Sequence, residues 1–435
     1  MHWNIKDTPP KETTAHLIEC LGVDPVIAQL LAQRNITSFE SAKAFFRPNI
    51  GQLHNPFLMQ DMDKAVERLR QAIKEKEALM VYGDYDVDGT TSVSLMTHFL
   101  RSQDVEVIPY IPDRYAEGYG LSIKGIDTAK KASIQLMIAL DCGVKAIEQV
   151  AYARTLGIEL IICDHHNPGK VLPDALAVLD PKRSDCAYPF KELCGCGVGF
   201  KLIQGLLEQQ GKEVNEIISY LDFVAVATAA DIVPMVGENR TLAFLGLQQL
   251  NSHPRPGIKA LMRNKPTSQT ISDVVFGMAP RINAAGRMKH GLHAVELLLS
   301  ATDEEAKKIA QEVETYNTSR REVEQEITKE ALAQIAENNE TNNATNVVFA
   351  PHWHKGVIGI VASRLIETYY RPTLVFTRSG EGVLAASARS VRGFDVYKAI
   401  DACRAHIIQF GGHKYAAGIT TVSYTHLTLP TTPYV

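Results

Sequence analysis

The segment GDYDVDGTTS, residues 83–92, carries three aspartates at alternating positions, Asp84, Asp86 and Asp88. Carboxylates that lie this close repel one another, and each is costly to keep ionised without a counter-charge. The segment therefore predicts that a cation or another positive group sits among these side chains.

Further acids and imidazoles follow other short apolar segments. In an open α/β sheet, the carboxyl ends of the strands form one edge, and ligands bind there. The side chains that would meet at this edge are Asp84, Asp86, Asp88, Asp141, Asp164, His165 and His166, with Asp231 as a further candidate. Hard divalent cations, Mn²⁺ or Mg²⁺, fit oxygen and imidazole ligands better than a thiolate zinc site does. Two such ions, roughly 3.5–4 Å apart, would bring an attacking water and a phosphate together.

Each of these residues taken alone has a simpler interpretation. An aspartate at a strand end is usually a helix cap or a turn residue, and the triplet at 164–166 could be a polar turn. We interpret CGCGVG, residues 194–199, as a tight turn with packing glycines, because it lacks the setting of a nucleotide-binding loop. Cys142 and Cys163 are interpreted as small buried hydrophobic residues. The joint pattern after three successive apolar segments favours the metal site.

The elements that must position these residues alternate along the chain. Buried strands are predicted at 78–83, 105–111, 134–140 and 158–163, and the intervening helices at 90–103, 124–132 and 145–157. This alternation predicts an α/β fold with a parallel sheet covered on both faces. Residues 302–339 predict one long helix that begins with a capping box of Thr302 and Glu305 and spans roughly 50 Å.

We place a domain boundary at this long helix. The expected parts are a helical N-terminal extension (1–75), the main α/β domain (76–301), the connecting helix and loop (302–344), a smaller α/β domain (345–421) and a foreign tail (422–435). The tail is rich in threonine and proline, resembles a translated sequencing adapter, and is excluded from the fold prediction.

Composition limits the class of protein. The net charge of −4 argues against a protein coated in basic charge for duplex DNA, but it allows a nucleic-acid enzyme with local arginines and bound cations. Seven scattered cysteines suit a reducing compartment, and neither a signal peptide nor a membrane-spanning run is visible. We expect a cytoplasmic protein that is a monomer.

The segments GDYDVDGTTS, LDCG and CDHH resemble the DHH phosphoesterase superfamily and, within it, the RecJ type of single-strand-specific exonuclease. The supporting segments are at 83–92, 112–122, 140–143, 163–166, 230–240, 280–288, 386–390 and 411–418. The last of them resembles the DHH-associated domain that follows the catalytic domain. The resemblance implies a 5′-to-3′ exonuclease that releases mononucleotides from single-stranded DNA in repair and recombination, with two Mn²⁺ or Mg²⁺ ions.

The resemblance also implies a role for each candidate residue. The expected ligands are Asp86, Asp88, His165 and Asp231, with Asp141 bridging the ions, Asp84 a ligand or its neighbour, and His166 a ligand or phosphate contact. Asp141, His165 and His166 would be the catalytic residues. Asp164 is expected to orient His165, because metal-bound histidines usually need such a partner.

Contacts to phosphate and DNA are expected from a second group of residues. They are Arg114, Arg281, Arg287, Ser387, Arg389 and His413. Guanidinium groups match phosphate oxygens two at a time, although an arginine taken singly is more often a surface ion pair. Ser387 and Arg389 are expected to hold the 5′-terminal phosphate, together with Arg281 or Arg114. Tyr115 and Tyr119 could stack on bases or pack within their own loop.

The expected partner is single-stranded DNA with a 5′ end, with a single-strand-binding protein and a helicase beside it and no membrane. Two other functions stay open: a phosphodiesterase that acts on short oligonucleotides, cyclic dinucleotides or pyrophosphate, and a non-catalytic replication scaffold. Complete enzymes of the RecJ type carry further sequence, including an oligonucleotide-binding barrel. The resemblance stops just after residue 420, so we expect the second domain to be incomplete.

Overall fold

The chain divides into two compact units, which are described separately. The computed structural model describes residues 5–231, 233–262 and 267–422. The first unit comprises residues 1–286 and 290–313, and the second comprises 287–289 and 314–435. The boundary falls within the long helix α15 (Asp303–Glu337). The predicted foreign tail lies outside the described residues, apart from Val422.

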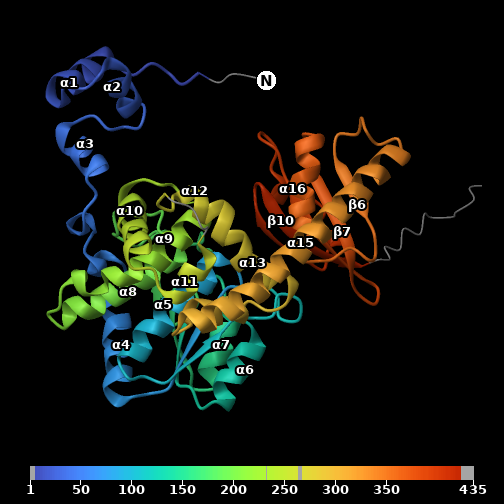
Figure 1. Cartoon of the computed structure of the whole chain (residues 1–435). Helices are drawn as coiled ribbons and strands as arrows, with labels where there is room; N and C mark the ends of the chain where they lie inside the picture. Colours follow the sequence, from blue (N-terminus) through green and yellow to red (C-terminus); the bar gives the residue numbers. More distant parts are fainter. Residues whose placement is uncertain (1–4, 232, 263–266, 423–435) are drawn as a thin grey trace, which may run out of the picture. The chain divides into compact units, whose positions relative to one another are not determined.

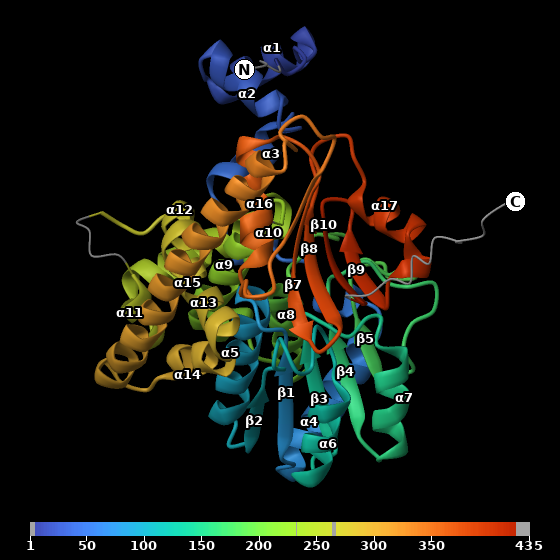
Figure 2. The same ribbon diagram turned by 90° about the vertical axis from the view of Figure 1, so that its right-hand side faces the viewer.

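The first unit contains a five-stranded parallel sheet with the strand order β2–β1–β3–β4–β5. Figure 1 labels the helices of this unit, and Figure 2 labels the five strands. Its strands are β1 (Leu79–Gly83), β2 (Val107–Tyr110), β3 (Leu136–Leu140), β4 (Glu159–Cys163) and β5 (Ala177–Leu179). Strands β1 to β4 lie at the four predicted positions, and every pair is parallel, which confirms the predicted fold class. The short strand β5 was not predicted, because three apolar residues make no recognisable pattern.

Helices cover both faces of this sheet. The helices between the strands are α5 (Val87–Ser102), α6 (Ile123–Lys131) and α7 (Ile147–Thr155). Figure 2 shows α6 and α7 in front of β1, β3 and β4, where Ile126 and Val150 share one buried cluster with Met80 and Met137. Helices α5 and α8 (Gly195–Gln209) pack against the other face and against each other. Strand residues alternate between the two faces, so both sets of helices bury apolar side chains.

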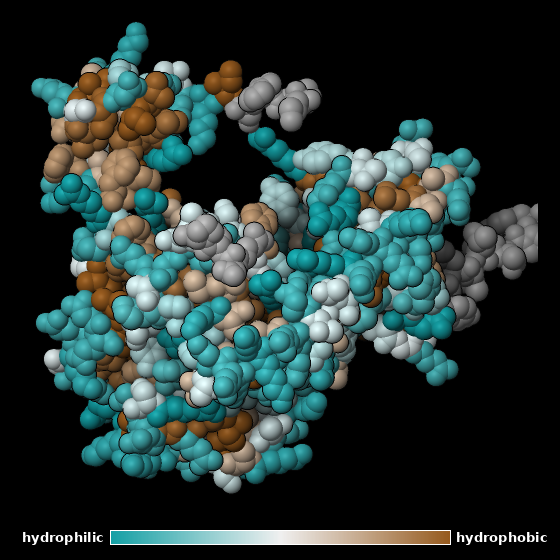
Figure 3. Space-filling model, in the orientation of Figure 1, coloured by the Kyte–Doolittle hydropathy of each residue, from teal (hydrophilic) through white to brown (hydrophobic). Residues whose placement is uncertain are grey.

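The remaining regular elements of the first unit are helices, and those up to residue 75 fit the predicted helical extension. Its remaining helices are α1 (Lys11–Leu21), α2 (Pro25–Ala32), α3 (Phe39–Phe46), α4 (Met62–Glu75), α9 (Leu221–Ala230), α10 (Gly237–Ser252), α11 (Pro256–Leu261), α12 (Ile271–Asp273), α13 (Ala279–Met288) and α14 (Leu292–Leu299). Helices α1 to α3 enclose a small core that includes Leu17 and Leu31. Figure 3 shows apolar side chains on the surface of this part, where Val26, Ile27 and Leu30 are exposed.

The second unit has a mixed five-stranded sheet with the order β6–β7–β8–β10–β9. Its elements are β6 (Asn346–Phe349), α16 (Ile358–Thr368), β7 (Thr373–Gly380), β8 (Val383–Arg389), α17 (Val396–Ala402), β9 (Gln409–His413) and β10 (Ala416–Val422). Strands β6 and β7 are parallel, and the other pairs are antiparallel. The second half of α15 packs on α16, because Ile327 and Ile335 share a buried cluster with Val361 and Leu365.

Among the described residues, no helix combines the length and the apolar character that crossing a membrane requires.

Candidate metal centre

Strand register places four aspartates in a row at the carboxyl edge of the parallel sheet. Gly83 pairs with Leu140, Leu140 with Cys163, and Cys163 with Leu179. The residue after each of these strand ends is an aspartate: Asp84, Asp141, Asp164 and Asp180. Three of the four were predicted, and the fourth was missed because the strand that carries it was missed. All four are buried.

The segment from Asp84 to Asp88 runs from the end of β1 into the first turn of α5 and carries three of the predicted ligands. Asp86 caps α5 by accepting a hydrogen bond from the N–H of Gly89 (3.1 Å), so it has the ordinary role of an aspartate at a helix start, and its role as a ligand stays a prediction. Asp88 lies in the first turn of the helix. A Cβ atom at Gly89 would lie 2.3 Å from the carbonyl oxygen of Asp84, so only glycine fits where the loop folds back on itself.

The predicted ligands converge into three overlapping groups. Within each group, one ligand atom per residue lies within 4.8 Å of the others. The groups are Asp84–Asp86–Asp141, Asp88–His165–Asp231 and Asp141–His165–His166. Asp141 belongs to two groups, and so does His165, which is the arrangement that two neighbouring ions would need. Asp231 reaches the site from the C-terminal end of α9 rather than from a strand.

The imidazole of His165 faces three carboxylates. Its Nε2 lies 3.2 Å from Oδ1 of Asp141, 3.5 Å from Oδ2 of Asp231 and 3.7 Å from Oδ2 of Asp88. Burial lowers the pKa of His165 to about 3, so the ring is neutral near pH 7 and has a lone pair to donate.

Burial and mutual repulsion raise the pKa values of the carboxyl groups at this edge. Burial, with Asp86 as the next cause, raises the pKa of Asp88 to about 6. Burial and the Asp88 charge raise the pKa of Asp231 to about 8. The pKa values of Asp84 and Asp141 are also raised well above the usual value, again chiefly by burial. Divalent cations would reverse these shifts by stabilising the ionised forms.

Buried polar atoms that lack a hydrogen-bond partner also indicate a cation site. Among the described residues, Oδ1 of Asp84, Nε2 of His165 and Oδ2 of Asp231 are buried without a hydrogen-bond partner. Buried polar atoms without partners are rare, and each one calls for an explanation such as an ion. The donors are oxygens and imidazole nitrogens, which are the ligands that Mn²⁺ and Mg²⁺ accept. The residues present therefore fit a site for hard divalent cations.

The prediction that Asp164 orients the ring of His165 is wrong. Oδ1 of Asp164 accepts a hydrogen bond of 2.7 Å from Nδ1 of His166 and another from the backbone N–H of His165. Its Oδ2 accepts from the N–H of Val144. Burial works against a charge on His166, but the Asp164 carboxylate outweighs it and raises the pKa of His166 to about 9. The carboxylate thus fixes the second histidine, whose Nε2 lies 3.1 Å from the hydroxyl of Tyr119.

The interpretation of residues 194–199 as a tight turn is also wrong. Gly195 begins helix α8, and the N–H groups of Gly195 and Cys196 donate to the two carboxylate oxygens of Asp88 at 2.6 and 2.8 Å. The thiol of Cys194 caps the helix by accepting from the N–H of Gly197. Sequence reasoning missed this because cysteine is not a typical helix cap.

The residues predicted to contact phosphate lie in both units, and each of them has a partner within its own unit. In the first unit, the guanidinium of Arg114 lies 3.8 Å from the centre of the Tyr85 ring, and Arg281 donates to the carbonyl of Leu261. In the second unit, Nη1 of Arg389 donates to the hydroxyl of Ser387 (3.0 Å).

Two further predicted contacts in the second unit have local partners. Nη1 of Arg287 donates to the carbonyl oxygen of Gly356, in the segment before α16. Nδ1 of His413, at the end of β9, accepts a hydrogen bond from the N–H of Tyr415. Their predicted roles toward DNA stay predictions.

Asp180 is a buried group at the same edge that the sequence did not single out. Its Oδ1 accepts from the N–H of Lys182 (2.7 Å), and its Oδ2 has no hydrogen-bond partner among the described residues. Burial is the main cause that raises the pKa of Asp180 to about 7. It belongs to none of the three ligand groups formed by the described residues.

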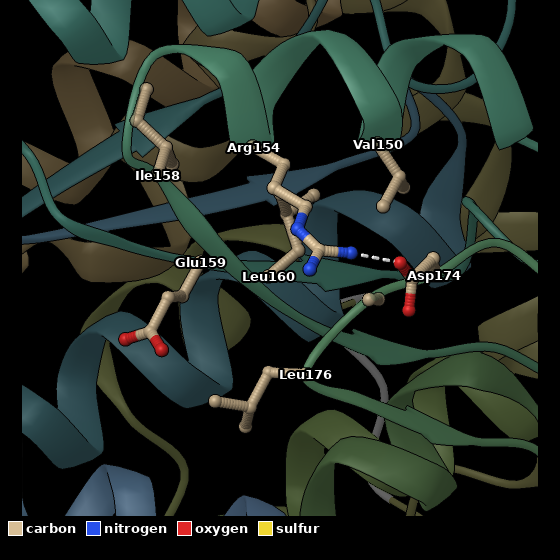
Figure 4. A pocket seen from close by; sticks show the side chains of 8 residues that line it. Val150, Arg154, Ile158, Glu159, Leu160, Asp174 and Leu176 are labelled. Atoms are coloured by element: carbon tan, nitrogen blue, oxygen red, sulfur yellow. Dashed lines mark hydrogen bonds and ion pairs between the residues drawn. The ribbon is translucent and has the colours of Figure 1, made fainter.

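A pocket at the opposite end of β4 lacks such chemistry. It lies between α7, the start of β4 and the segment before β5, with Val150, Leu160 and Leu176 on its wall (Figure 4). Arg154 and Asp174 form an ion pair across it. Ligands of open α/β sheets bind at the carboxyl edge, so this pocket is not the candidate site.

Comparisons with known proteins agree with the fold. Residues 78–228 match the DHH family, N-terminal domain, and residues 340–427 match the DHHA1 domain. The single-stranded-DNA-specific exonuclease RecJ of Bacillus subtilis is 39% identical over 427 residues, which are 97% of this chain and 53% of that protein. RecJ of Salmonella typhimurium is 37% identical over 91% of this chain and 72% of that protein.

Solved structures agree. The structure of Thermus thermophilus RecJ in complex with Mn²⁺ superposes with a TM-score of 0.84 at 28% identity, over 96% of this chain and 60% of that one. A structure of exonuclease RecJ bound to manganese gives a TM-score of 0.74 at 30% identity, over 86% of this chain and 92% of that one.

The parallel sheet with its row of aspartates, followed by a DHHA1 domain, defines a protein of the DHH class. Within that class, the chain belongs to the RecJ family. It spans about half the length of the Bacillus subtilis relative.

Proposed function

We propose that this protein is a single-stranded-DNA-specific exonuclease that removes mononucleotides from the 5′ end by metal-dependent hydrolysis, in DNA repair and recombination. The observation that carries the proposal is the convergence of Asp141 and His165 with both sets of neighbouring acids. The names of the relatives at 39% and 37% identity support the substrate and the reaction.

The residues of the centre have distinct proposed roles. When bound, two Mn²⁺ or Mg²⁺ ions would supply an activated water and neutralise phosphate charge. Asp84, Asp86 and Asp141 would hold one ion, Asp88, His165 and Asp231 the other, and Asp141 would join them.

His166 is proposed to contact the phosphate. The Asp164 carboxylate accepts a hydrogen bond from Nδ1 of His166 and so keeps a proton there. The pKa of His166 is raised to about 9, so its imidazole is a cation near neutral pH. Its Nε2 is held near the hydroxyl of Tyr119, at 3.1 Å. A fixed cation beside the scissile phosphate would stabilise the negative charge that builds up during hydrolysis. Arg114, held against the ring of Tyr85, is proposed to act in the same way.

The second unit contains a candidate cradle for the 5′-terminal phosphate. Arg389 is half-buried, and burial lowers its pKa without a carboxylate among the described residues to offset it. A half-buried guanidinium without an acidic partner suits an anionic ligand. Ser387 lies beside it, and the first turn of α16 faces both: a Cβ at Gly359 would lie 2.9 Å from Nη2 of Arg389 and from Oγ of Ser387. Helix N-termini favour phosphate.

A methyl group at Gly359 is expected to disrupt this cradle. In Gly359→Ala, the new methyl would displace Arg389 and Ser387, and preference for a 5′-phosphorylated end over a 5′-hydroxyl end should fall about tenfold, since a hydrogen bond to a charged group contributes roughly 1.5–3 kcal/mol. Competition between the two substrates measures this preference. Gly380→Ala is the control, because no atom lies within 4 Å of its new Cβ. An unchanged preference in Gly359→Ala would contradict the cradle.

The wider setting of the enzyme is also a proposal. We propose a monomer in the cytoplasm that degrades strands which a helicase has opened and a single-strand-binding protein has coated. The names of the relatives, which specify single-stranded DNA, support this setting.

The function is tested by incubating the purified chain with 5′-phosphorylated single-stranded DNA and Mn²⁺ and sizing the products over time. Stepwise release of mononucleotides from the 5′ end is expected, and duplex DNA should stay intact. Cleavage restricted to di- and trinucleotides would indicate the short-oligonucleotide phosphodiesterase instead. Two bound Mn²⁺ ions without hydrolysis of either substrate would contradict the proposed activity, and no Mn²⁺ binding would indicate a non-catalytic scaffold.

A further inference from the structure

The first turn of helix α8 contacts two predicted ligands, Asp88 and Asp141, which belong to different ligand groups. Asp88, which belongs to the group with His165 and Asp231, is only 1% exposed and accepts two backbone hydrogen bonds from this turn. The donors are the N–H of Gly195, 2.6 Å from Oδ2, and the N–H of Cys196, 2.8 Å from Oδ1. Two donors on two oxygens fix the plane of the carboxylate, and each oxygen keeps a lone pair for another partner.

The same turn also lies against Asp141, which belongs to the other two groups. A Cβ atom at Gly195 would lie 2.6 Å from Cβ and 2.7 Å from Cα of Asp141. The Asp141 backbone has little freedom to move away, because its φ is +58° and its N–H donates to the carbonyl of Cys163 (2.9 Å). Glycine at 195 is therefore what allows α8 to approach the bridging carboxylate.

Helix α8 is itself held in place away from the centre. Lys201, two turns along, is fully buried, and its Nζ donates to Oε1 of Glu238 (3.0 Å) and to the carbonyl of His54 (2.7 Å). A buried charge with several fixed partners leaves the helix little freedom to slide. The position of the first turn is thus set by the packed interior of the first unit.

We propose that Gly195 and Cys196 are positioning residues that fix Asp88 and Asp141 relative to each other, and that this contact sets the affinity of both ion positions. The inference rests on the proposed function insofar as the centre binds two divalent ions. Residues that hold metal ligands in place typically change metal affinity 10- to 100-fold when altered.

The first test compares two glycine-to-alanine changes in the same turn. Gly195→Ala adds a methyl that collides with Asp141. Gly197→Ala adds the same methyl at a position where the nearest atom, Cδ2 of Leu193, is 3.4 Å away, an ordinary contact. Mn²⁺ affinity, measured calorimetrically on the full chain, should fall about 10- to 100-fold in Gly195→Ala and stay within about twofold in Gly197→Ala. Thermal unfolding in a chelator records any structural loss separately.

A second pair of variants tests the hydrogen bond from Cys196 to Asp88 by itself. It tests the inference even if Gly195→Ala does not fold. Cys196→Pro removes the N–H that reaches Asp88, at a first-turn position where proline is tolerated. Cys196→Ala removes the thiol and keeps the N–H. Mn²⁺ should bind about tenfold more weakly to the proline variant than to the alanine variant.

The outcomes separate the inference from the function on which it rests. Wild-type affinity in Gly195→Ala, or equal affinity in the two Cys196 variants, overturns the inference and leaves the proposed function intact. A lower unfolding temperature in chelator with unchanged Mn²⁺ affinity would show a merely structural role and also overturns it. A wild-type chain that binds no Mn²⁺ overturns the proposed function and the inference together.

Discussion

Asp141→Asn is expected to remove nuclease activity, with a loss of about 1000-fold or more in kcat, while the protein folds normally. Asp141 belongs to two of the three ligand groups that the described residues form, so its replacement should affect both ion positions. Asparagine is the informative replacement, because the residue has a φ of +58° and asparagine tolerates this left-handed conformation better than alanine does. Activity on 5′-phosphorylated single-stranded DNA and calorimetric Mn²⁺ binding measure the effect.

The same variant should be more stable than the wild type in the absence of metal. Asp141 is buried among carboxylates, and burial raises its pKa well above the usual value, so its charge opposes folding at neutral pH. Asp104→Asn is a matched control, because Asp104 also has a positive φ (+56°) and belongs to none of the ligand groups formed by the described residues. Substantial activity in Asp141→Asn would contradict a bridging role.

Removing divalent metal is expected to make stability fall as the pH rises from about 6.5 to 8.5. The raised pKa values of Asp231, about 8, and His166, about 9, mean that the folded chain holds more protons than the unfolded chain in this range. Since unfolding then releases protons, the free energy of unfolding decreases as the pH increases. One pKa unit corresponds to about 1.4 kcal/mol, so a loss of roughly 1–3 kcal/mol is expected over the range.

Mn²⁺ should weaken or reverse this trend, because the ions bind the deprotonated carboxylates and stabilise the folded chain more at higher pH. Thermal unfolding at several pH values, with chelator and with Mn²⁺, measures both effects. Asp141→Asn in chelator should show a shallower slope. Stability in chelator that rises with pH, or an equal slope with and without Mn²⁺, would show that the carboxylates of the centre do not behave as an unneutralised cluster.

The sequence was sufficient to predict the positions of Asp84, Asp141 and Asp164. Each follows an apolar run long enough to identify a strand, and parallel strands bring their carboxyl ends to one edge. The register Gly83–Leu140–Cys163 then places the three acids side by side. Alternation of strands and helices was sufficient to predict the class of fold, because it admits few arrangements other than a covered parallel sheet.

What the sequence did not predict depends on contacts between distant segments. The hydrogen bonds from α8 to Asp88 join residues more than 100 positions apart, and no local pattern around Cys194 signals them. The partner of Asp164 is the ring of His166 rather than that of His165, because the rotamers of two adjacent histidines depend on the packed site. Asp180 was missed because β5 has only three residues.

Crystals of the protein soaked in Mn²⁺ and measured at an X-ray wavelength where manganese scatters anomalously test the central claim most directly. We predict two anomalous peaks at the carboxyl edge of the parallel sheet, roughly 3.5–4 Å apart, as two-ion phosphoesterase centres have. One peak should contact Asp84, Asp86 and Asp141, and the other Asp88, His165 and Asp231. No peak at this edge, or a single ion that does not contact Asp141, would contradict the two-ion centre.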